Sequence, residues 1–242
     1  MKKKCIIIPA YNEGGNIANV IQEIKKVTDV DLFIIDDGSK DHTKKMAKQA
    51  GAYVISHPFN MGYGVALQTG YKFALRNNYD ILLQIDGDGQ HIPDMIPEFF
   101  KKIESGECDV LIGSRFLGKG GYNPRLLKKI GIFLFKVIIR LINNARITDP
   151  TSGYQCMTKE VFRIFTDDSF PCDYPDTNII VRLHRMGFIV KELPVTMREN
   201  PEGRSMHKGT LTLMYYFFTM FLSIFISLIS SKNYYKKKAL DI

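Results

Sequence analysis

The alternation of short apolar runs with helix-like segments is the feature that most constrains what this chain can fold into. The runs are short and continuously apolar, which is typical of strands buried on both faces of a sheet. The predicted strands are Cys5–Ile8, Leu32–Ile35, Tyr53–Ile55, Ile81–Ile85 and Val110–Gly113. The predicted helices between them cover residues 17–24, a segment ending near residue 50, residues 62–76 and residues 93–105. This order predicts a doubly wound, mostly parallel α/β sheet, whose ligands bind beyond the carboxyl ends of the strands.

Size, charge and cysteine content narrow the class of protein. The 242 residues, 45% of them hydrophobic, suit one α/β domain with an appendage. The net charge of +8 favours phosphorylated substrates or anionic lipid, and without a recognisable nucleic-acid-binding module no nucleic acid partner is expected. The four cysteines form no CxxC pair, which argues against a zinc site and favours a reducing compartment. The apolar run near the N-terminus is too short for a signal peptide, so the catalytic part is expected to stay in the cytoplasm.

Polar and glycine-rich blocks stand where the predicted strands end and the helices begin. The block Pro9–Glu13 follows the first strand, and the block Asp36–Thr43 follows the second. Asn60–Ala66 opens a helix, and Asp86–His91 follows the fourth strand. Each block alone is a weak signal, because a pair of aspartates or a glycine-opened helix is common. Four blocks in this order, at one edge of a sheet, are a strong signal of a ligand site.

These blocks resemble those of family 2 glycosyltransferases with the GT-A fold, over roughly residues 4–205. Within that family the likeness is to dolichyl-phosphate mannose synthase and its bacterial polyprenyl-phosphate relatives, which the blocks Gly113–Arg115, Asp149–Gly153 and Arg198–Ser205 also resemble. The resemblance implies an inverting, metal-dependent transfer of a sugar from a UDP- or GDP-sugar to a polyprenyl phosphate. The chain has no tryptophan, so the Gln-x-x-Arg-Trp block of processive polysaccharide synthases is absent.

Two aspartates are the candidates for a metal site. Asp86 and Asp88 stand two residues apart after a predicted strand, so they are expected to point to the same side of the sheet. Two carboxylates there can hold Mg²⁺ or Mn²⁺, which prefer oxygen ligands. The resemblance adds Gln90 to this metal site. It also implies that the nucleotide-sugar is bound by Pro9, Ala10, Tyr11, Glu13, Asp36, Asp37, Gly64 and Asp86.

Cationic side chains are the candidates for binding phosphate, because arginine can donate two parallel hydrogen bonds to phosphate oxygens. Arg115 and Arg198, together with Asp86 and Asp88, form the predicted catalytic set. The alternative interpretation is that each of these cationic side chains is an ordinary surface charge in contact with solvent. The resemblance implies that the acceptor phosphate is bound by Arg115, Lys129, Arg198, Arg204 and Ser205.

Other polar residues of these blocks are expected to serve the fold. Asp41 and Thr43 precede and begin a helical pattern, so they are expected to cap that helix. Three histidines stand alone in the sequence, and none of them is expected to bind a ligand. They are His42, His57 and His91.

The last third of the chain predicts membrane association. Leu211–Ser231 carries no charged residue and, at 21 residues, is long enough to cross a bilayer, for which about 20 are needed. A single span, a hairpin that dips in and returns, and a pair of interfacial helices all remain open, as does a buried helix of a soluble core. Upstream, Ile130–Ile142 combines an apolar face with a basic stripe, which suits the membrane interface or an ordinary surface helix. The stripe consists of Arg125, Lys129, Lys136 and Arg140.

The predicted organisation is a catalytic domain at residues 1–205 and a membrane-associated segment at residues 206–242, acting at the cytoplasmic face of the cell membrane. A small membrane-protein partner and a homo-oligomer are further expectations. Two other functions stay open: transfer to a hydroxyl of a lipid-linked or cell-wall glycan, and a non-catalytic scaffold in a membrane glycan complex. A hydroxyl acceptor needs a general base, and the residues in the corresponding stretch, Asp173 and Asp176, match the family pattern poorly.

Overall fold

The computed structural model describes residues 2–117, 147–173, 175–198 and 210–229, together with isolated helical positions between 131 and 140. These residues form a seven-stranded sheet in the order β3-β2-β1-β4-β6-β5-β7. The strands are β1 (Lys4–Ala10), β2 (Asp31–Asp36), β3 (Tyr53–Ser56), β4 (Ile81–Gln84), β5 (Val110–Ser114), β6 (Gln155–Thr158) and β7 (Val190–Pro194). The five predicted strands are confirmed, each within two residues of its predicted ends.

One strand reverses the direction of the sheet. The strands β1 to β4 run parallel to one another, and β5 runs parallel to β7. Between these two groups, β6 runs antiparallel to both its neighbours, β4 and β5. Gln155, the first residue of β6, therefore pairs with Gln84, the last residue of β4. The segment before β6 thus enters the sheet from the carboxyl edge of the parallel strands; β6 and β7 lie outside the predicted strands.

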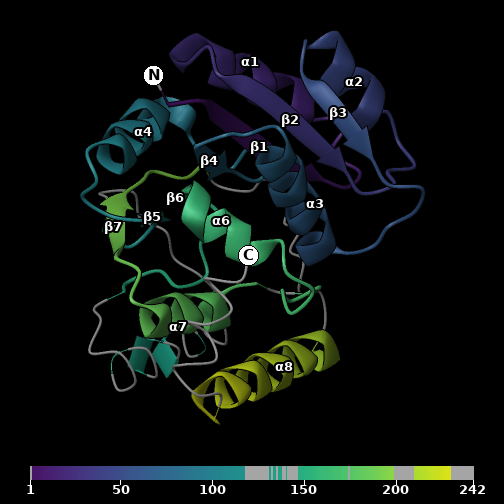
Figure 1. The fold of residues 1–242 in the computed structure, drawn as a ribbon. Coiled ribbons are helices and arrows are strands. Elements are labelled where there is room, and N and C mark those ends of the chain that lie inside the picture. The colour runs from purple at the N-terminus through teal and green to yellow at the C-terminus, as the bar shows by residue number, and fades with distance from the viewer. Residues whose placement is uncertain are drawn as a thin grey trace.

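Two layers of helices cover the sheet, because successive residues of a buried strand point to opposite faces. In β1, Cys5 and Ile7 belong to one core, and Ile6 and Ile8 belong to the other. The first core is covered by α3 (Tyr63–Arg76), α6 (Lys159–Phe165) and α7 (Thr177–Met186). The second core is covered by α1 (Ile17–Val27), α2 (Thr43–Gln49) and α4 (Ile96–Glu104), as Figure 1 shows.

Two helix starts differ from the predicted ones, for reasons of backbone chemistry. The helix expected over residues 93–105 begins as the short 3₁₀ helix η1 (Pro93–Met95) and continues as α4. Pro97, in the first turn of α4, has no N–H to donate to the preceding turn. The helix α3 begins at Tyr63 rather than at Gly62, which has a φ of 102° that glycine adopts without strain.

The helix α8 (Thr210–Ile229) lies at one end of the molecule, beside α7 (Figure 1). Among its described side chains, Met220 and Ile224 are buried, whereas Phe218 and Phe225 are exposed. Within the described ranges, no helix combines the length and the hydropathy that crossing a membrane requires.

The predicted basic stripe is only partly described. Lys136 places its ammonium 4.1 Å from the centre of the Phe116 ring, and Arg140 is exposed. The apolar side chains of Phe133 and Leu134 are also exposed. The other two members of the stripe, residues 125 and 129, lie outside the described residues.

Candidate active site

The loops that follow β1 and β2 are hydrogen-bonded into one unit at the carboxyl edge of the sheet. The backbone N–H groups of residues 12, 13 and 14 donate to the side-chain oxygens of Ser39, Thr43 and Asp41 at 2.8–2.9 Å. Asp41 also accepts from the backbone N–H of Thr43, the first residue of α2, at 2.9 Å, although the N-cap position of this helix is His42 and not Asp41 as predicted. The two loops that are predicted to bind the nucleotide therefore hold each other in place.

Asp37, a predicted nucleotide-binding residue, already has three partners within the protein. The buried carboxylate accepts from the backbone N–H groups of Met61 and Gly62, both at 2.9 Å, and lies 2.7 Å from Nδ1 of His57. His57 in turn places Nε2 2.9 Å from the hydroxyl of Thr69 in α3. His57, which looks solitary in the sequence, is thus a partner of Asp37, and this carboxylate fixes the loop that leads into α3. Nucleotide binding by Asp37 stays a prediction.

The other predicted nucleotide-binding residues of these two loops lie at the same edge. Pro9 and Ala10 end β1, and the carbonyl of Ala10 accepts from the backbone N–H of Asp37 at 2.9 Å. Asp36 is buried at the end of β2, where it accepts from the backbone N–H of Ser39 at 3.1 Å. Tyr11 is exposed, and the carboxylate of Glu13 accepts from the Asn16 amide at 2.9 Å. Nucleotide-sugar binding by these residues stays a prediction.

Gly64 is needed for close packing of the chain against itself. A Cβ at this position would lie 2.3 Å from the carbonyl oxygen of Pro171 and 2.4 Å from that of Cys172. The loop before α7 therefore runs directly over the start of α3. The close approach at Gly64 is therefore made by protein backbone, and nucleotide-sugar binding by Gly64 stays a prediction.

Asp86 lies just beyond β4 with a partner at each carboxylate oxygen. The hydroxyl of Tyr63 donates to Oδ1 at 3.0 Å, and Nε2 of His91 lies 3.4 Å from Oδ2. Burial alone raises the pKa of Asp86, but His91, Tyr63 and the more distant Arg115 outweigh it, so the pKa is lowered. Burial and the negative charge of Asp86 raise the pKa of Tyr63, which keeps its hydroxyl protonated. His91 is therefore part of the candidate site, contrary to its solitary appearance in the sequence.

Asp88 has fewer partners than Asp86. Its carboxylate accepts a hydrogen bond from the backbone N–H of Gln90, at 3.0 Å. Burial and the charge of Asp86, with a smaller effect of Glu13, raise the pKa of Asp88 to about 6. Such mutual repulsion between carboxylates fits a site for a divalent cation, which would relieve it.

The predicted metal ligands Asp86, Asp88 and Gln90 come from a single loop. Among the residues that the structure describes, no group of three or more histidine, cysteine, aspartate or glutamate side chains could hold a metal ion. The two carboxylates therefore need oxygen ligands from elsewhere to complete a coordination shell, and substrate phosphates commonly supply them.

Arg115, a predicted phosphate anchor, is buried and paired with a carboxylate. Its Nε and Nη2 donate to Asp149 at 2.6 Å each, and Nη2 also donates to the hydroxyl of Thr151 at 2.9 Å. The backbone N–H of Asp149 donates to Glu192 of β7 at 2.7 Å, and burial raises the pKa of Glu192. The pair of Arg115 and Asp149 thus joins the segment before β6 to the end of β5, and the hydrogen bond from Asp149 to Glu192 joins the same segment to β7. Phosphate binding by Arg115 stays a prediction, since this bidentate pair occupies much of its donor set.

Arg198 contacts the predicted metal loop with its backbone and, at 3.4 Å, with Nη1 against the carbonyl of Gly89, but its guanidinium is paired mainly with a carboxylate of α1. Its N–H donates to the carbonyl of Gln90 at 2.8 Å, whereas its guanidinium donates to Glu23 of α1 at 2.8 and 2.9 Å. Binding of the acceptor phosphate by Arg198 also stays a prediction. The other predicted phosphate-binding residues, Lys129, Arg204 and Ser205, lie outside the described residues.

The loop before α7 carries the two aspartates considered as general bases. Asp176 immediately precedes α7, and its negative charge acts on Tyr63, which contacts Asp86. Asp173 instead accepts from the hydroxyl of Tyr215 in α8 at 3.1 Å. Of the two, Asp176 is therefore the one associated with the candidate site.

Besides His91, the residues Tyr63 and Gly153 belong to the site but are missing from the predicted set. A Cβ at Gly153 would lie 2.7 and 2.8 Å from the carboxylate oxygens of Asp86 and 3.0 Å from the Tyr63 hydroxyl. The amide of Gln84 donates to the carbonyl of Gly153 at 3.1 Å, which fixes this backbone against the end of β4. Both residues belong to blocks noted in the sequence. Those blocks indicated where the site lies, but they did not indicate that Tyr63 and Gly153 contact Asp86.

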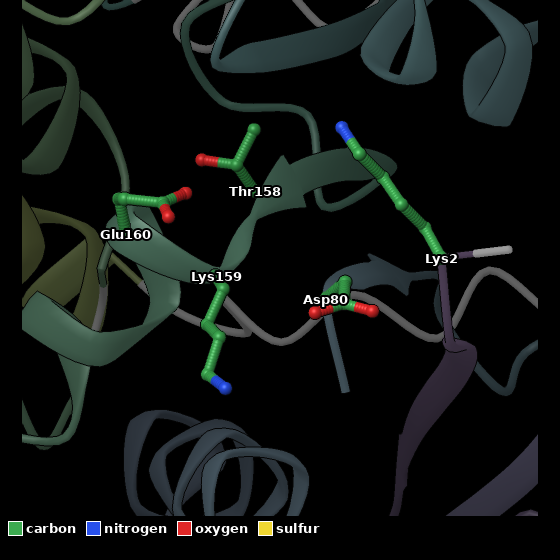
Figure 2. Close-up of a pocket in the computed structure, with 5 residues that line it drawn as sticks. All are labelled: Lys2, Asp80, Thr158, Lys159 and Glu160. Carbon is green, nitrogen blue, oxygen red and sulfur yellow. The ribbon is translucent and has the colours of Figure 1, made fainter. Parts of the chain in front are cut away.

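A pocket of about 360 Å³ opens at the opposite edge of the sheet. Asp80 precedes β4 there, and Thr158, the last residue of the antiparallel β6, pairs with Ile81 at the start of β4. Figure 2 shows its lining, which contains two lysines and two carboxylates in addition to Thr158. The lining residues are Lys2, Asp80, Thr158, Lys159 and Glu160. This pocket is therefore separate from the acidic loops at the carboxyl edge.

Known proteins match the chain in both sequence and fold. The model of Glycosyl transferase family 2 matches residues 5–165. The UDP-N-acetylglucosamine–dolichyl-phosphate N-acetylglucosaminyltransferase of Methanococcus voltae is 31% identical over 180 residues, 67% of this chain and 72% of the relative. The polyprenol monophosphomannose synthase of Mycolicibacterium smegmatis is 26% identical over 221 residues, 86% of this chain and 82% of the relative. Glucosyl-3-phosphoglycerate synthase of Mycobacterium tuberculosis, solved with Mn²⁺ and UDP-glucose, shares the fold with a TM-score of 0.68 at 20% identity, over 92% of this chain and 79% of that one.

Proposed function

Since the chain belongs to glycosyl transferase family 2, we propose that it transfers a sugar, with inversion, from a UDP- or GDP-sugar to a polyprenyl phosphate at the cytoplasmic face of the membrane. The observation that carries this proposal is the placement of Asp86 and Asp88 beside the interlocked loops after β1 and β2. That arrangement supplies carboxylates for a metal-bound diphosphate and a preformed cradle for a nucleotide. The matches to two lipid-phosphate transferases support the acceptor class.

The residues present fit a hard divalent cation. Asp86, Asp88 and Gln90 would hold Mg²⁺ or Mn²⁺, with the donor diphosphate supplying further oxygens. Bound there, the cation would neutralise negative charge that develops on the departing nucleoside diphosphate. The mycobacterial synthase of the same fold was solved with Mn²⁺ and UDP-glucose, and we carry this cation and this donor class over to the present chain as part of the proposal.

The acceptor determines how much chemistry the protein must supply. A lipid phosphate is already anionic at pH 7, so its oxygen can attack the anomeric carbon without a strong general base. The new bond forms from that oxygen to the anomeric carbon, and the bond from that carbon to the diphosphate oxygen breaks. The nucleoside diphosphate leaves from the opposite face, which inverts the configuration. The protein then mainly positions the reactants and stabilises charge.

The exposed face of α8 supports binding at a membrane surface. Phe218, Phe225 and Ile226 are 66%, 59% and 54% exposed. Lysines at positions 208, 232 and 236–238 flank this helix in the sequence, where they can attract anionic headgroups. An apolar helix face with basic flanks suits a helix that lies in the plane of the interface. We therefore assign α8 to the surface of an anionic bilayer.

Sugar transfer is tested with the full-length protein in detergent. A panel of UDP- and GDP-sugars is offered with undecaprenyl phosphate, in Mn²⁺ or in EDTA, and lipid-extractable label is measured. We expect label from one donor in Mn²⁺, none in EDTA, and release of the sugar by mild acid, because a sugar phosphodiester to a polyprenol is acid-labile. Acid-stable product would instead indicate a hydroxyl acceptor and direct attention to Asp176. Neither product nor metal-dependent nucleotide binding would favour the scaffold.

Membrane binding is tested separately by flotation with vesicles containing anionic lipid. We expect replacement of Phe218 and Phe225 by serine to reduce the bound fraction several-fold. The matched control is Ile189→Ser, which alters an exposed apolar side chain (53%) outside α8 and should leave flotation unchanged. Equal flotation of all three proteins would contradict the assignment of α8.

A further inference from the structure

The carboxylate of Asp86 is held from two sides by side chains of different origin. Tyr63, the first residue of α3, reaches one oxygen at 3.0 Å, and His91, which follows the same loop as Asp86, lies 3.4 Å from the other. His91 is itself almost fully buried and packs edge-on against the ring of Tyr154 at 5.1 Å. Rotation of the Asp86 carboxylate about its last bond would break both contacts at once.

A third side of Asp86 is closed by backbone. Gly153 approaches so closely that a single added carbon would lie 2.7 Å from one oxygen of Asp86 and 3.0 Å from the hydroxyl of Tyr63. The hydrogen bond from Gln84 to the carbonyl of Gly153 holds that backbone in place. The tyrosine, the aspartate and the glycine therefore form one packed contact in which none of the three can shift alone.

Tyr63 is itself fixed at its backbone from both directions. The preceding residue, Gly62, donates its N–H to Asp37 at 2.9 Å, and the following residue, Gly64, lies under the carbonyl of Pro171. Asp37, after β2, fixes the backbone next to Tyr63, and the Tyr63 hydroxyl contacts Asp86, after β4. The Tyr63 side chain therefore links these two loops. By contrast, Asp88 accepts a hydrogen bond only from its own loop among the described contacts, from the backbone N–H of Gln90.

We propose that Tyr63 is a positioning residue for the proposed transfer: together with His91, it orients the Asp86 carboxylate that would hold the divalent cation. This role rests on the proposed function. An outer partner that orients a metal-binding carboxylate typically contributes about 10- to 100-fold in metal affinity. Removal of the Tyr63 hydroxyl frees the carboxylate to rotate, and the resulting loss concerns metal and diphosphate binding more than turnover at saturation.

The test compares Tyr63→Phe with a matched change at the other edge of the sheet. Tyr79 also donates to an aspartate, Asp31, at 2.6 Å, so Tyr79→Phe removes the same type of hydrogen bond away from the acidic loops. Binding of Mn²⁺ in the presence of UDP or GDP is measured by calorimetry on the full chain. We expect Tyr63→Phe to weaken Mn²⁺ binding about 10- to 100-fold and Tyr79→Phe to change it less than about twofold.

A structural role of Tyr63 would be distinguished by two further measurements. Thermal unfolding should shift no more in Tyr63→Phe than in Tyr79→Phe, and the KM for Mn²⁺ should rise while kcat at saturating Mn²⁺ changes less than about threefold. His91→Gln, which alters the second contact of the same carboxylate, should weaken Mn²⁺ binding in the same direction. Wild-type affinity in both Tyr63→Phe and His91→Gln overturns the positioning role alone. Wild-type protein that binds neither nucleotide with Mn²⁺ overturns the proposed function and the positioning role together.

Discussion

The two edges of the central sheet each carry a tyrosine that donates to an aspartate, yet only one edge has the features of an active site. At the amino edge, Tyr79 donates to Asp31 at 2.6 Å, and the ammonium of Lys3 lies 4.2 Å from the centre of the tyrosine ring. At the carboxyl edge, Tyr63 donates to Asp86 at 3.0 Å. The hydrogen bond alone therefore does not distinguish a functional edge from a structural one.

The difference lies in the charges that surround each pair. The pocket at the amino edge mixes lysines with carboxylates, so charges of opposite sign compensate each other there. At the carboxyl edge, burial together with the negative charge of Asp86 raises the pKa of Asp88 to about 6. Arg115, whose charge helps to lower the pKa of Asp86, is itself paired with Asp149. Negative charge that the fold leaves uncompensated is thus what marks the carboxyl edge.

The largest effect is expected from removing one of the two carboxylates. Asp88→Asn should lower transfer by about 1000-fold or more, because electrostatic stabilisation of the leaving group is lost, while the fold remains intact. Asp80→Asn should leave the rate within about twofold. The carboxylate of Asp80 accepts a hydrogen bond from the backbone N–H of Lys3, at the amino edge of the sheet and therefore opposite the acidic loops. Initial rates of labelled lipid product measure both variants. Near-normal transfer by Asp88→Asn would remove the basis for assigning function to this edge.

A buried ion pair and a surface ion pair should differ in their effect on stability. Arg115→Ala leaves Asp149 buried without its cation, which should cost about 3–5 kcal/mol in the free energy of unfolding. Lys4→Ala, which removes the partly exposed pair with Glu104 at the amino edge, should cost less than about 1 kcal/mol. Urea denaturation measures both values. Similar losses in the two variants would show that Arg115 is not the anchor of the segment before β6.

Adding one carbon beside Asp86 should disturb the site without removing any polar group. Gly153→Ala forces the new methyl group against the Asp86 carboxylate and the Tyr63 hydroxyl, which should destabilise the protein by about 1–3 kcal/mol and impair Mn²⁺ binding. Gly15→Ala is the control, since a Cβ there meets nothing within 4 Å. Calorimetric Mn²⁺ titrations and urea denaturation report the two effects. An unaffected Gly153→Ala protein would mean that Asp86 can move freely.

The smallest effect is a dependence of stability on pH. The folded protein protonates Asp88 below about pH 6, whereas a free aspartate is protonated only below about pH 4. Between these values the folded state binds more protons, so the free energy of unfolding rises as the pH falls. In EDTA, we expect the contribution of Asp88 to grow by about 1 kcal/mol from pH 7 to pH 5.

The control for that measurement is the difference between two variants. Asp88→Asn should lose this part of the pH dependence, whereas Asp80→Asn, at the other edge, should keep it. Parallel pH profiles for the wild type and both variants would show that the two edges do not differ in uncompensated charge.

The sequence pattern within each short segment predicted those strands and helices whose formation depends mainly on neighbouring residues. The runs that became β1, β2 and β4 are continuously apolar, and the polar blocks after them lie at one edge because parallel strands end there. The antiparallel strand β6 could not be predicted from such patterns. Its position in the sheet is set by pairing between residues that are far apart in the chain, such as Gln84 and Gln155.

The partners of individual side chains were harder to predict than the edge where they lie. Arg115 and Asp149 stand out in separate blocks, but nothing local shows that they bind each other rather than a phosphate. His57 and His91 look solitary in the sequence because their acidic partners come from other loops or from a turn of the same loop. Residue types thus indicated the chemistry of the site, whereas the pairing of those residues required the tertiary structure.

The interlocked loops after β1 and β2 have a consequence for protein engineering. Because the N–H groups of residues 12–14 bind side chains of residues 39, 41 and 43, either loop loses its supports when the other is replaced. A chimera that borrows donor preference from a relative should therefore exchange both loops as a cassette. Exchange of one loop alone should yield a protein that folds but has a misshapen nucleotide cradle, whichever sugar the borrowed loop prefers.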